Sequence, residues 1–380
     1  MTVRKATKKT AIQVGIWGLG RAGWGMHCPE LDRFKDEFEV VAGCDIDPNR
    51  VDELLARYPK AKGYTDGSKF LSDKNIELVS VAVRSPQHAD YAIRALEAGK
   101  MVFLEKPIAI SPKGLKALEA AVAKYPGKLF FRQNRRFESC FNHVQELIHS
   151  GILGDVYEIK LCRHGFEFRD DWQTLMECGG GQLNNWGPHI IDHGLRLLDA
   201  PLKSVWGDLK TVAALGDAED HLKIILKGEN GRLVDIEISG GVALPSPVYA
   251  VYGSRGSLVS EDEQDIRLKY LDPNQKAPTH KASPATPPRG GYGGTVKPKW
   301  IRKTIMAEPS NGWTVSDIYH ALYQTIREGK PFPVKPEEAL DVLRVILEVK
   351  KQNPAYPVTA DVFEKAAPAS SRSPRSTRKH

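Results

Sequence analysis

The chain has 380 residues, of which 41% are hydrophobic and 27% are charged, a balance typical of a globular protein with room for two domains. Its apolar runs fall short of the ~20 residues that span a bilayer, and no signal-peptide core follows the basic start. We therefore expect a cytoplasmic protein with no membrane contact. The five cysteines form no C-x-x-C pair, so we expect no metal site.

The net charge of +7 originates at the two ends of the chain. Residues 1–10 carry four basic side chains, residues 366–380 carry four more, and neither segment contains an acid. The body between them is therefore slightly acidic. We predict that both ends are disordered basic tails, and we expect no specific nucleic-acid partner.

Strand and helix patterns alternate along residues 11–132. The apolar run at 78–83 is continuous, as expected for a parallel strand that is buried on both faces. This alternation predicts a doubly wound parallel sheet, that is, a Rossmann dinucleotide-binding domain over 11–132. The predicted strands are 12–17, 38–44, 78–83, 101–104 and 128–132, and the predicted helices are 50–58, 89–98 and 115–124.

The pattern changes near residue 133, which predicts a second, α+β domain over 133–365. Half-exposed strands joined by short turns indicate a large, mostly antiparallel open sheet, so the overall fold class is α/β. A Pro/Gly-rich stretch at 272–299 is predicted to be an irregular excursion or a lid. The predicted strands are 155–163, 204–211, 221–226, 232–239 and 249–253, and the predicted helices are 140–149, 315–328 and 336–352.

A glycine-rich turn follows the first predicted strand. The first glycine permits the tight turn, the second lets a pyrophosphate approach the backbone, and the third allows helix and strand to pack closely. The helix that follows offers free N–H groups to phosphates. The residues predicted to bind the cofactor here are Gly18, Leu19, Gly20, Arg21, Ala22 and Gly23.

The end of the second strand indicates which cofactor is bound. Asp45 could accept hydrogen bonds from ribose hydroxyls, and its charge would repel a 2′-phosphate, which favours NAD. Arg50 is close enough in sequence to leave NADP open. The alternative for Asp45 is an ordinary turn residue.

Lys106 follows the predicted strand 101–104, at the edge where parallel sheets bind ligands. A lysine there can hydrogen-bond a substrate hydroxyl and stabilise an alkoxide as hydride leaves. The spacing alone is equally compatible with an ordinary surface lysine.

The segment 179–193 contains a second polar group. A helix is predicted from about Pro188, with Asn185 as its N-cap. His189 and Asp192 are three residues apart and share a helix face. The pKa of His189 is expected near neutrality, so it can accept a proton while Asp192 fixes its tautomer. The alternative is a capping asparagine followed by a buried His–Asp pair.

A polar loop precedes this segment. Arg169 and Asp171 can bridge vicinal hydroxyls and Trp172 can cover a ring face, as in carbohydrate sites. Arg136 and Asp192 are expected to contribute to substrate binding in the same way. The alternative is a surface turn with one half-buried tryptophan.

These motifs together resemble the glucose–fructose oxidoreductase / inositol dehydrogenase (Gfo/Idh/MocA) family over residues 11–352. The resemblance implies that Lys106 and His189 are catalytic and that the substrate is a sugar, cyclitol or derivative. It also implies that the open sheet forms the interface of a homodimer or homotetramer. The matching segments are 18–23, 85–88, 98–100, 105–107, 134–137, 150–156, 179–192 and 327–334.

The sequence departs from the family pattern at two places. Asn185 stands where inositol-dehydrogenase-like members have an aspartate, and an amide cannot take up a proton, so Asn185 is expected to orient the substrate. The second departure is a turn in which His88 follows Pro86 after two positions instead of three. This turn is expected beside the cofactor, with contacts from Ser85, Pro86 and His88. Glu105 and Lys106, after the strand 101–104, are also expected to contact the cofactor.

The sequence therefore predicts an NAD(P)-dependent oxidoreductase that acts on a secondary alcohol or ketone of a sugar, cyclitol or glycoside. One alternative is an enzyme that cleaves or epimerises glycosides while recycling its NAD. Another is a non-catalytic NAD-binding regulatory protein, because Asn185 replaces an acid.

Overall fold

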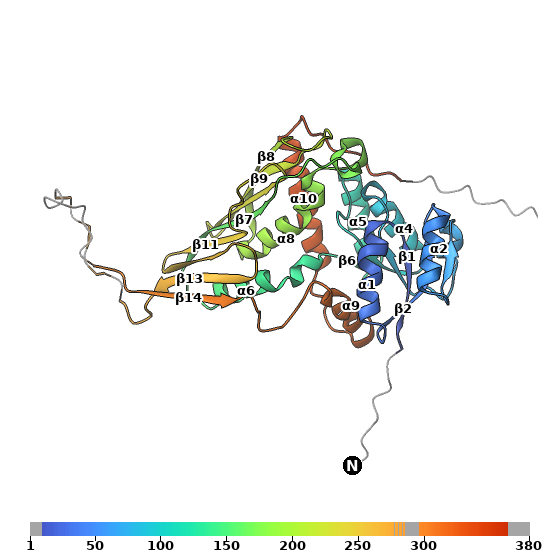
Figure 1. The fold of residues 1–380 in the computed structure, drawn as a ribbon, viewed down its shortest axis with the longest axis horizontal. Coiled ribbons are helices and arrows are strands. Elements are labelled where there is room, and N and C mark those ends of the chain that lie inside the picture. The colour runs from blue at the N-terminus through green and yellow to red at the C-terminus, as the bar shows by residue number, and fades with distance from the viewer. Residues whose placement is uncertain (1–9, 277, 280, 283, 286–295, 364–380) are drawn as a thin grey trace, which may run out of the picture.

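The computed structural model describes residues 10–276, 278–279, 281–282, 284–285 and 296–363. It has two parts that lie side by side, each built around a β-sheet (Figure 1). The predicted basic tails lie outside the described residues, apart from Thr10. Among the described residues, no helix is long and apolar enough to cross a membrane.

The first part is a six-stranded parallel sheet in the order β3-β2-β1-β4-β5-β6. This arrangement confirms the predicted doubly wound sheet, with β1 and β4 adjacent where the strand order reverses. The strand β3 was not expected from the sequence because its three residues lack an apolar run. The strands are β1 (Ile12–Trp17), β2 (Phe38–Cys44), β3 (Lys62–Tyr64), β4 (Leu78–Val81), β5 (Met101–Leu104) and β6 (Leu129–Phe131).

Helices cover both faces of this sheet and explain the continuous apolar strands. Asp47, Asp66 and Ser111 cap three of them by accepting hydrogen bonds from backbone N–H groups in the first turn. The helices are α1 (Cys28–Arg33) after a π-helical stretch η1 (Gly23–His27), α2 (Pro48–Arg57), α3 (Gly67–Leu71), α4 (His88–Glu97) and α5 (Pro112–Lys124).

The second part is an eight-stranded sheet in the order β14-β13-β12-β11-β7-β10-β9-β8. Its strand pairs are antiparallel except for β7 with β10, which confirms a mostly antiparallel sheet. The strands are β7 (Val156–His164), β8 (Leu202–Lys210), β9 (His221–Gly228), β10 (Leu233–Ser239), β11 (Tyr249–Gly253), β12 (Gly256–Ser260), β13 (Asp265–Leu271) and β14 (Trp300–Met306).

One face of this sheet is covered by α6 (Ser139–His149), α8 (Gly187–Leu198) and α10 (Pro336–Gln352) (Figure 1). Gly194 lets α8 approach β10 closely, because a Cβ there would lie 2.9 Å from the Ile236 side chain. On the opposite face, Lys223 of β9 pairs with Asp235 at 2.7 Å and Glu237 at 2.9 Å. We call this second surface the open face.

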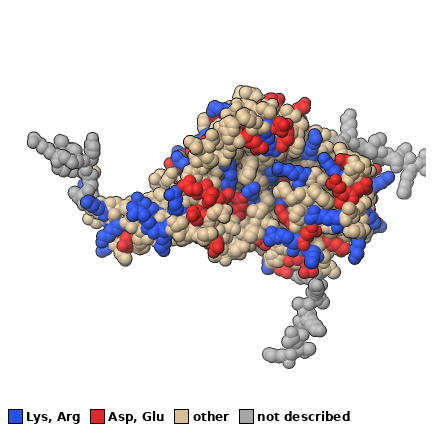
Figure 2. Space-filling model, viewed as in Figure 1, with Lys and Arg blue, Asp and Glu red and all other residues tan. Residues whose placement is uncertain are grey.

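The strands β13 and β14 lie at the end of the molecule away from the Rossmann sheet (Figure 1). The Pro/Gly-rich stretch predicted between them as an excursion or a lid lies outside the described residues at 277, 280, 283 and 286–295, so that expectation stays a prediction. Figure 2 shows basic side chains concentrated over this end, while both signs of charge are interspersed over the rest of the visible face.

The C-terminal part of the chain packs on both sheets. Helix α9 (Asp317–Glu328) lies beside α1, and its Tyr319 packs against Phe38 and Phe103 in the Rossmann core (Figure 1). The first half of α10 adds Leu340 and Leu343 to the same domain. The boundary at 132/133 therefore remains a prediction, because segments far beyond it complete the Rossmann domain.

Candidate active site

The glycine turn has the geometry that a dinucleotide requires. Gly18 has φ +97°, and a Cβ there would lie 2.6 Å from the Ala82 backbone. A Cβ on Gly23 would lie 1.9 Å from the Gly18 carbonyl oxygen, whereas one on Gly20 would meet only an Arg50 nitrogen at 3.6 Å. The first and third glycines are thus needed for close packing, and the second leaves room above the turn. These residues fit the pyrophosphate of NAD(P) at the start of a helix.

Asp45 and Arg50 lie beside this turn. The Asp45 carboxylate accepts hydrogen bonds from Leu19 N at 2.7 Å and Asp47 N at 3.0 Å, so it stabilises the turn, and its contact with the ribose stays a prediction. The guanidinium of Arg50 lies 3.7 Å from that carboxylate and is half exposed. Arg50, which could bind a 2′-phosphate, therefore lies next to Asp45, whose negative charge would repel one.

The turn after β4 holds the loop that contains Lys106. The His88 ring is buried between two backbone carbonyls, with Nδ1 2.6 Å from Pro107 O and Nε2 2.9 Å from Val83 O. Burial lowers its pKa. The expectation that His88 contacts the cofactor stays a prediction, although both ring nitrogens lie next to backbone carbonyls. Ser85 and Pro86 lie in the same turn, and their cofactor contacts stay a prediction.

Lys106 reaches from the end of β5 to the second domain, where its Nζ donates a hydrogen bond to Asn185 O at 3.0 Å. Burial lowers its pKa to about 8, against the opposing effect of the Glu105 carboxylate. The guanidinium groups of Arg132, Arg21 and Arg135 lower it further. An amine with such a pKa can gain a proton, and its ammonium form can lose one, near neutral pH.

Glu105 lies beneath the site rather than in it. Its side chain is 3% exposed and pairs with Arg132 at 2.7 Å, while its other oxygen accepts a hydrogen bond from Lys106 N at 3.0 Å. The expected cofactor contact of Glu105 stays a prediction, although both oxygens already accept hydrogen bonds inside the protein.

Asn185 ends the short helix α7 (Gln182–Asn185) and does not cap α8. The predicted N-cap is wrong because α8 begins at Gly187 with Trp186 at the cap position, although Pro188 does lie in its first turn as predicted. Lys350 pairs with Glu219 at 3.0 Å, and Glu219 accepts a hydrogen bond from Leu183 N at 3.1 Å at the start of α7.

His189 is buried in the first turn of α8. Burial holds its pKa well below the ordinary range, and the nearby cations Lys106 and Arg135 lower it further, so the expected near-neutral pKa is wrong. Within the described residues, its Nδ1 has no hydrogen-bond partner. His189 is thus a neutral imidazole with a free ring nitrogen beside a cation.

Asp192 and Arg136 form a buried ion pair with one another. The Asp192 carboxylate binds two nitrogens of the Arg136 guanidinium, which also contacts Glu338 and donates to Pro333 O at 3.0 Å. Asp192 therefore does not fix the tautomer of His189. The expected substrate contacts of Arg136 and Asp192 stay a prediction, although their charges already pair with each other and with Glu338 of α10.

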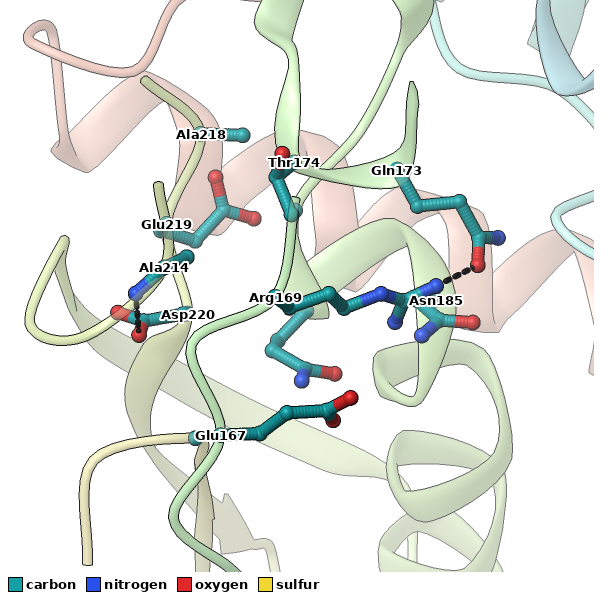
Figure 3. Close-up of a pocket in the computed structure, with 12 residues that line it drawn as sticks. Glu167, Arg169, Gln173, Thr174, Asn185, Ala214, Ala218, Glu219 and Asp220 are labelled. Carbon is teal, nitrogen blue, oxygen red and sulfur yellow. Dashed lines mark hydrogen bonds between the residues drawn. The ribbon is translucent and has the colours of Figure 1, made fainter. Parts of the chain in front are cut away.

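The predicted sugar-binding loop lies along a polar hollow near Asn185. Figure 3 shows Arg169 extending toward Gln173 and Asn185, with Glu167 pointing to the same hollow. Asp171 pairs with Arg169 at 2.8 Å from outside the lining residues. The Trp172 ring, 5.7 Å from the guanidinium carbon of Arg84, connects the loop to the Rossmann domain. Of the predicted set, Arg169 and Asn185 line the hollow directly.

Sequence reasoning missed the polar residues that support Lys106 and α7 from below. Arg132 is fully buried at the end of β6, and a charged residue directly after an apolar strand could have indicated it. The pairing of His27 with Tyr319, and of Glu219 with Lys350, had no local signal because the partners are far apart in sequence.

The fold and the site together define an NAD(P)-binding oxidoreductase. The oxidoreductase-family model for the NAD-binding Rossmann fold, GFO_IDH_MocA, matches residues 12–132, and the model of the GFO/IDH/MocA C-terminal domain matches residues 141–259. The chain therefore belongs to the Gfo/Idh/MocA family, which confirms the resemblance seen in the sequence.

Known proteins of the family align over most of the chain. The NADP(+)-dependent scyllo-inositol 2-dehydrogenase IolW of Bacillus subtilis is 28% identical, covering 91% of this chain and 95% of that protein. An inositol 2-dehydrogenase of Acidothermus cellulolyticus is 26% identical, covering 67% and 74% respectively. The crystal structure of the WlbA dehydrogenase of Bordetella pertussis, in complex with NADH and UDP-GlcNAcA, has the same fold, with a TM-score of 0.70 at 20% identity over 90% of this chain and 97% of that one.

Proposed function

We propose that this protein is an NAD(P)-dependent dehydrogenase that oxidises a secondary alcohol of a sugar, cyclitol or glycoside, or reduces the corresponding ketone. The observation that carries the proposal is Lys106 at the ligand edge of the Rossmann sheet, where its Nζ donates to Asn185 O and its charge lowers the pKa of the buried His189. Relatives named inositol dehydrogenases support the substrate class.

Lys106 and His189 have different roles at the substrate oxygen. When bound, the nicotinamide of NAD(P) supplies the hydride acceptor or donor. Lys106 holds the oxygen by a hydrogen bond, exchanging its bond to Asn185 O for one to the substrate, and stabilises negative charge that develops there. His189 takes the hydroxyl proton on a ring nitrogen in the oxidative direction and returns it in the reductive direction.

The hollow beside Asn185 suits a ligand with several hydroxyl groups. Arg169 and Gln173 offer donors, Glu167 offers an acceptor, and the amide of Asn185 offers both. Closely spaced donors and acceptors match vicinal hydroxyls, which both donate and accept hydrogen bonds. This composition supports a polyol over an apolar alcohol.

The test is cofactor turnover on a panel of cyclitols, aldoses and glycosides with NAD+ and with NADP+. We expect absorbance at 340 nm to rise with at least one polyol, and Lys106→Met to reduce kcat by about a hundredfold, the scale reported for loss of one oxyanion donor. Lys116→Met, at an exposed position on α5, is the matched control. Turnover of many equivalents of glycoside without added cofactor would instead indicate a cleaving or epimerising enzyme that recycles its cofactor.

We also propose that the open face of the large sheet joins two copies of the chain. Trp206 on this face is 54% exposed, and it lies near the ladder formed by Lys223, Asp235 and Glu237. Large exposed aromatic side chains are enriched at protein–protein interfaces, whose rims are polar. Light scattering should give a dimer or tetramer for the native protein and a smaller species for Trp206→Glu, and a monomeric native protein would contradict the proposal.

A further inference from the structure

A buried chain of polar side chains runs beneath Lys106. Tyr319 Oη lies 2.5 Å from His27 Nδ1, and His27 Nε2 lies 3.2 Å from Glu105 Oε1. Arg132 joins the same Glu105 oxygen at 2.7 Å and Glu30 at 2.6 Å. Four of these side chains are at most 4% exposed, and Glu30 is 12% exposed.

The members of this chain come from segments that only the fold brings together. Glu105 and Arg132 follow β5 and β6, His27 ends the π-helical stretch η1, and Tyr319 belongs to α9. The rings of His27 and Tyr319 also pack edge-on against Phe103 of β5. None of these described side chains lines the polar hollow, so their effect on the site is indirect.

The hydrogen bonds have a defined direction. The Arg132 guanidinium and the His27 ring hold the pKa of Glu105 well below its ordinary value even though burial opposes this, so Glu105 is a carboxylate that only accepts. His27 must therefore donate from Nε2. In the neutral ring, Nδ1 then accepts from the Tyr319 hydroxyl, which has Ser80 Oγ as a second neighbour at 3.3 Å.

Glu105 connects the buried chain of polar side chains to Lys106. Its second oxygen accepts a hydrogen bond from Lys106 N at 3.0 Å, which fixes the backbone at the point where the lysine side chain begins. Glu105 is also the anion that favours the charged ammonium of Lys106, against the nearby cations Arg132, Arg21 and Arg135.

We propose that His27 and Tyr319 are positioning residues for Lys106, which they hold in place through the Glu105 carboxylate. Without the hydrogen bond from His27, the carboxylate keeps Arg132 as its side-chain partner and can rotate toward it. The anion then moves away from Lys106, and the hydrogen bond to Lys106 N loosens. The inference rests on the proposed function only in taking Lys106 as the residue that acts on the substrate.

The charges around Lys106 set the expected direction of the effect. Glu105 raises its pKa, whereas Arg132, Arg21 and Arg135 lower it, and the neighbouring His189 is neutral. Weakening the hydrogen bond from His27 to Glu105 therefore leaves the pKa-lowering effect of the three arginines less opposed by the Glu105 charge. The pKa of Lys106 should fall below its native value of about 8. We expect a shift of about one unit, a tenfold change in acidity.

The test measures the acidity of Lys106 directly in the cofactor-free, full-length protein. An amine-selective acetylating reagent is applied across a pH series, and labelling of the peptide that contains Lys106 is quantified by mass spectrometry. In the native protein the midpoint should lie at about 8, and Lys116 on the exposed face of α5 serves as an internal reference. No substrate is needed, so the result does not depend on the proposed reaction.

Two variants of His27 decide between positioning and mere packing. His27→Leu removes both hydrogen bonds and should lower the labelling midpoint by about one pH unit. His27→Gln retains a hydrogen-bond donor and should keep the midpoint near the native value. An unchanged midpoint in folded His27→Leu protein would overturn the inference. If that variant does not fold, the same midpoint is measured in Tyr319→Phe, which keeps the ring against Phe38 and Phe103. An unshifted midpoint in Tyr319→Phe would then count against the inference.

Kinetics then separates the two proposals. Once a substrate is known, His27→Leu should shift the pH profile of kcat in parallel with the labelling midpoint, with KM little changed. A shifted midpoint in a protein that turns over no polyol would leave the inference standing and count against the dehydrogenase function.

Discussion

Replacing Lys350 by methionine should destabilise the protein strongly. Lys350 Nζ lies 3.0 Å from Glu219 Oε2, and both side chains are buried. Methionine fills a similar volume but leaves the Glu219 carboxylate without its cation. Removing one partner of a buried ion pair costs about 3–5 kcal/mol, because the remaining charge is left uncompensated. At roughly 2–4 °C per kcal/mol, the unfolding midpoint of this domain should fall by about 10 °C.

The adjacent Lys351 supplies the matched control. It is 79% exposed and lies 3.7 Å from Glu348, a surface pair worth about 0–1 kcal/mol. Differential scanning fluorimetry should therefore show Lys351→Met near the native midpoint and Lys350→Met far below it. Adding Glu219→Gln to Lys350→Met should recover part of the loss. Equal midpoints for the two single variants would refute the reasoning.

The same pair has a consequence for the site. Glu219 accepts a hydrogen bond from Leu183 N and thereby holds the start of α7, whose last residue supplies the carbonyl oxygen that Lys106 contacts. Below its unfolding midpoint, Lys350→Met should therefore bind its cofactor normally but turn over substrate more slowly than Lys351→Met.

Further predictions concern the cofactor and the pH profile. Gly23→Ala should abolish NAD(H) binding in calorimetry, because its Cβ would lie 1.9 Å from Gly18 O, whereas Gly25→Ala should bind normally since nothing lies within 4 Å of its Cβ. Arg50→Gln should weaken NADP binding about tenfold and leave NAD binding nearly unchanged, as measured by fluorescence titration. Ketone reduction and alcohol oxidation should both slow as pH rises through about 8, where Lys106 loses the positive charge that stabilises the developing alkoxide.

The fold was largely predictable because its strands and helices have strong local patterns. The apolar runs that became β1, β2, β4 and β5 and the periodic helices α2, α4 and α10 were found near their observed bounds. The strands β3, β12, β13 and β14 were not predicted. Neither β3 nor β14 contains a buried residue, whereas β12 and β13 have the alternating burial of a half-exposed sheet and were missed. The return of α9 to the Rossmann core had no local signal, because His27, the hydrogen-bond partner of Tyr319, lies 292 residues earlier.

The site was predictable where a single segment makes it. The glycine turn depends on backbone conformation within six residues, and the position of Lys106 follows from where a parallel strand ends. Side-chain partnerships were not predictable: His189 and Asp192 share one helix, yet Asp192 binds Arg136 from another segment. Spacing along a helix shows which side chains are close enough to interact, but residues from distant segments determined which ion pairs formed.

The most direct test of the dehydrogenase account is transfer of deuterium from a polyol to the cofactor. Cyclitols and sugars deuterated at the carbinol carbons are incubated with the enzyme and NAD+ or NADP+, and the reduced cofactor is analysed by mass spectrometry. We predict one deuterium in the reduced nicotinamide with the native enzyme and with Lys116→Met, and a rate lower by about a hundredfold with Lys106→Met. Absence of transfer from every compound, or equal transfer by Lys106→Met, would contradict the account.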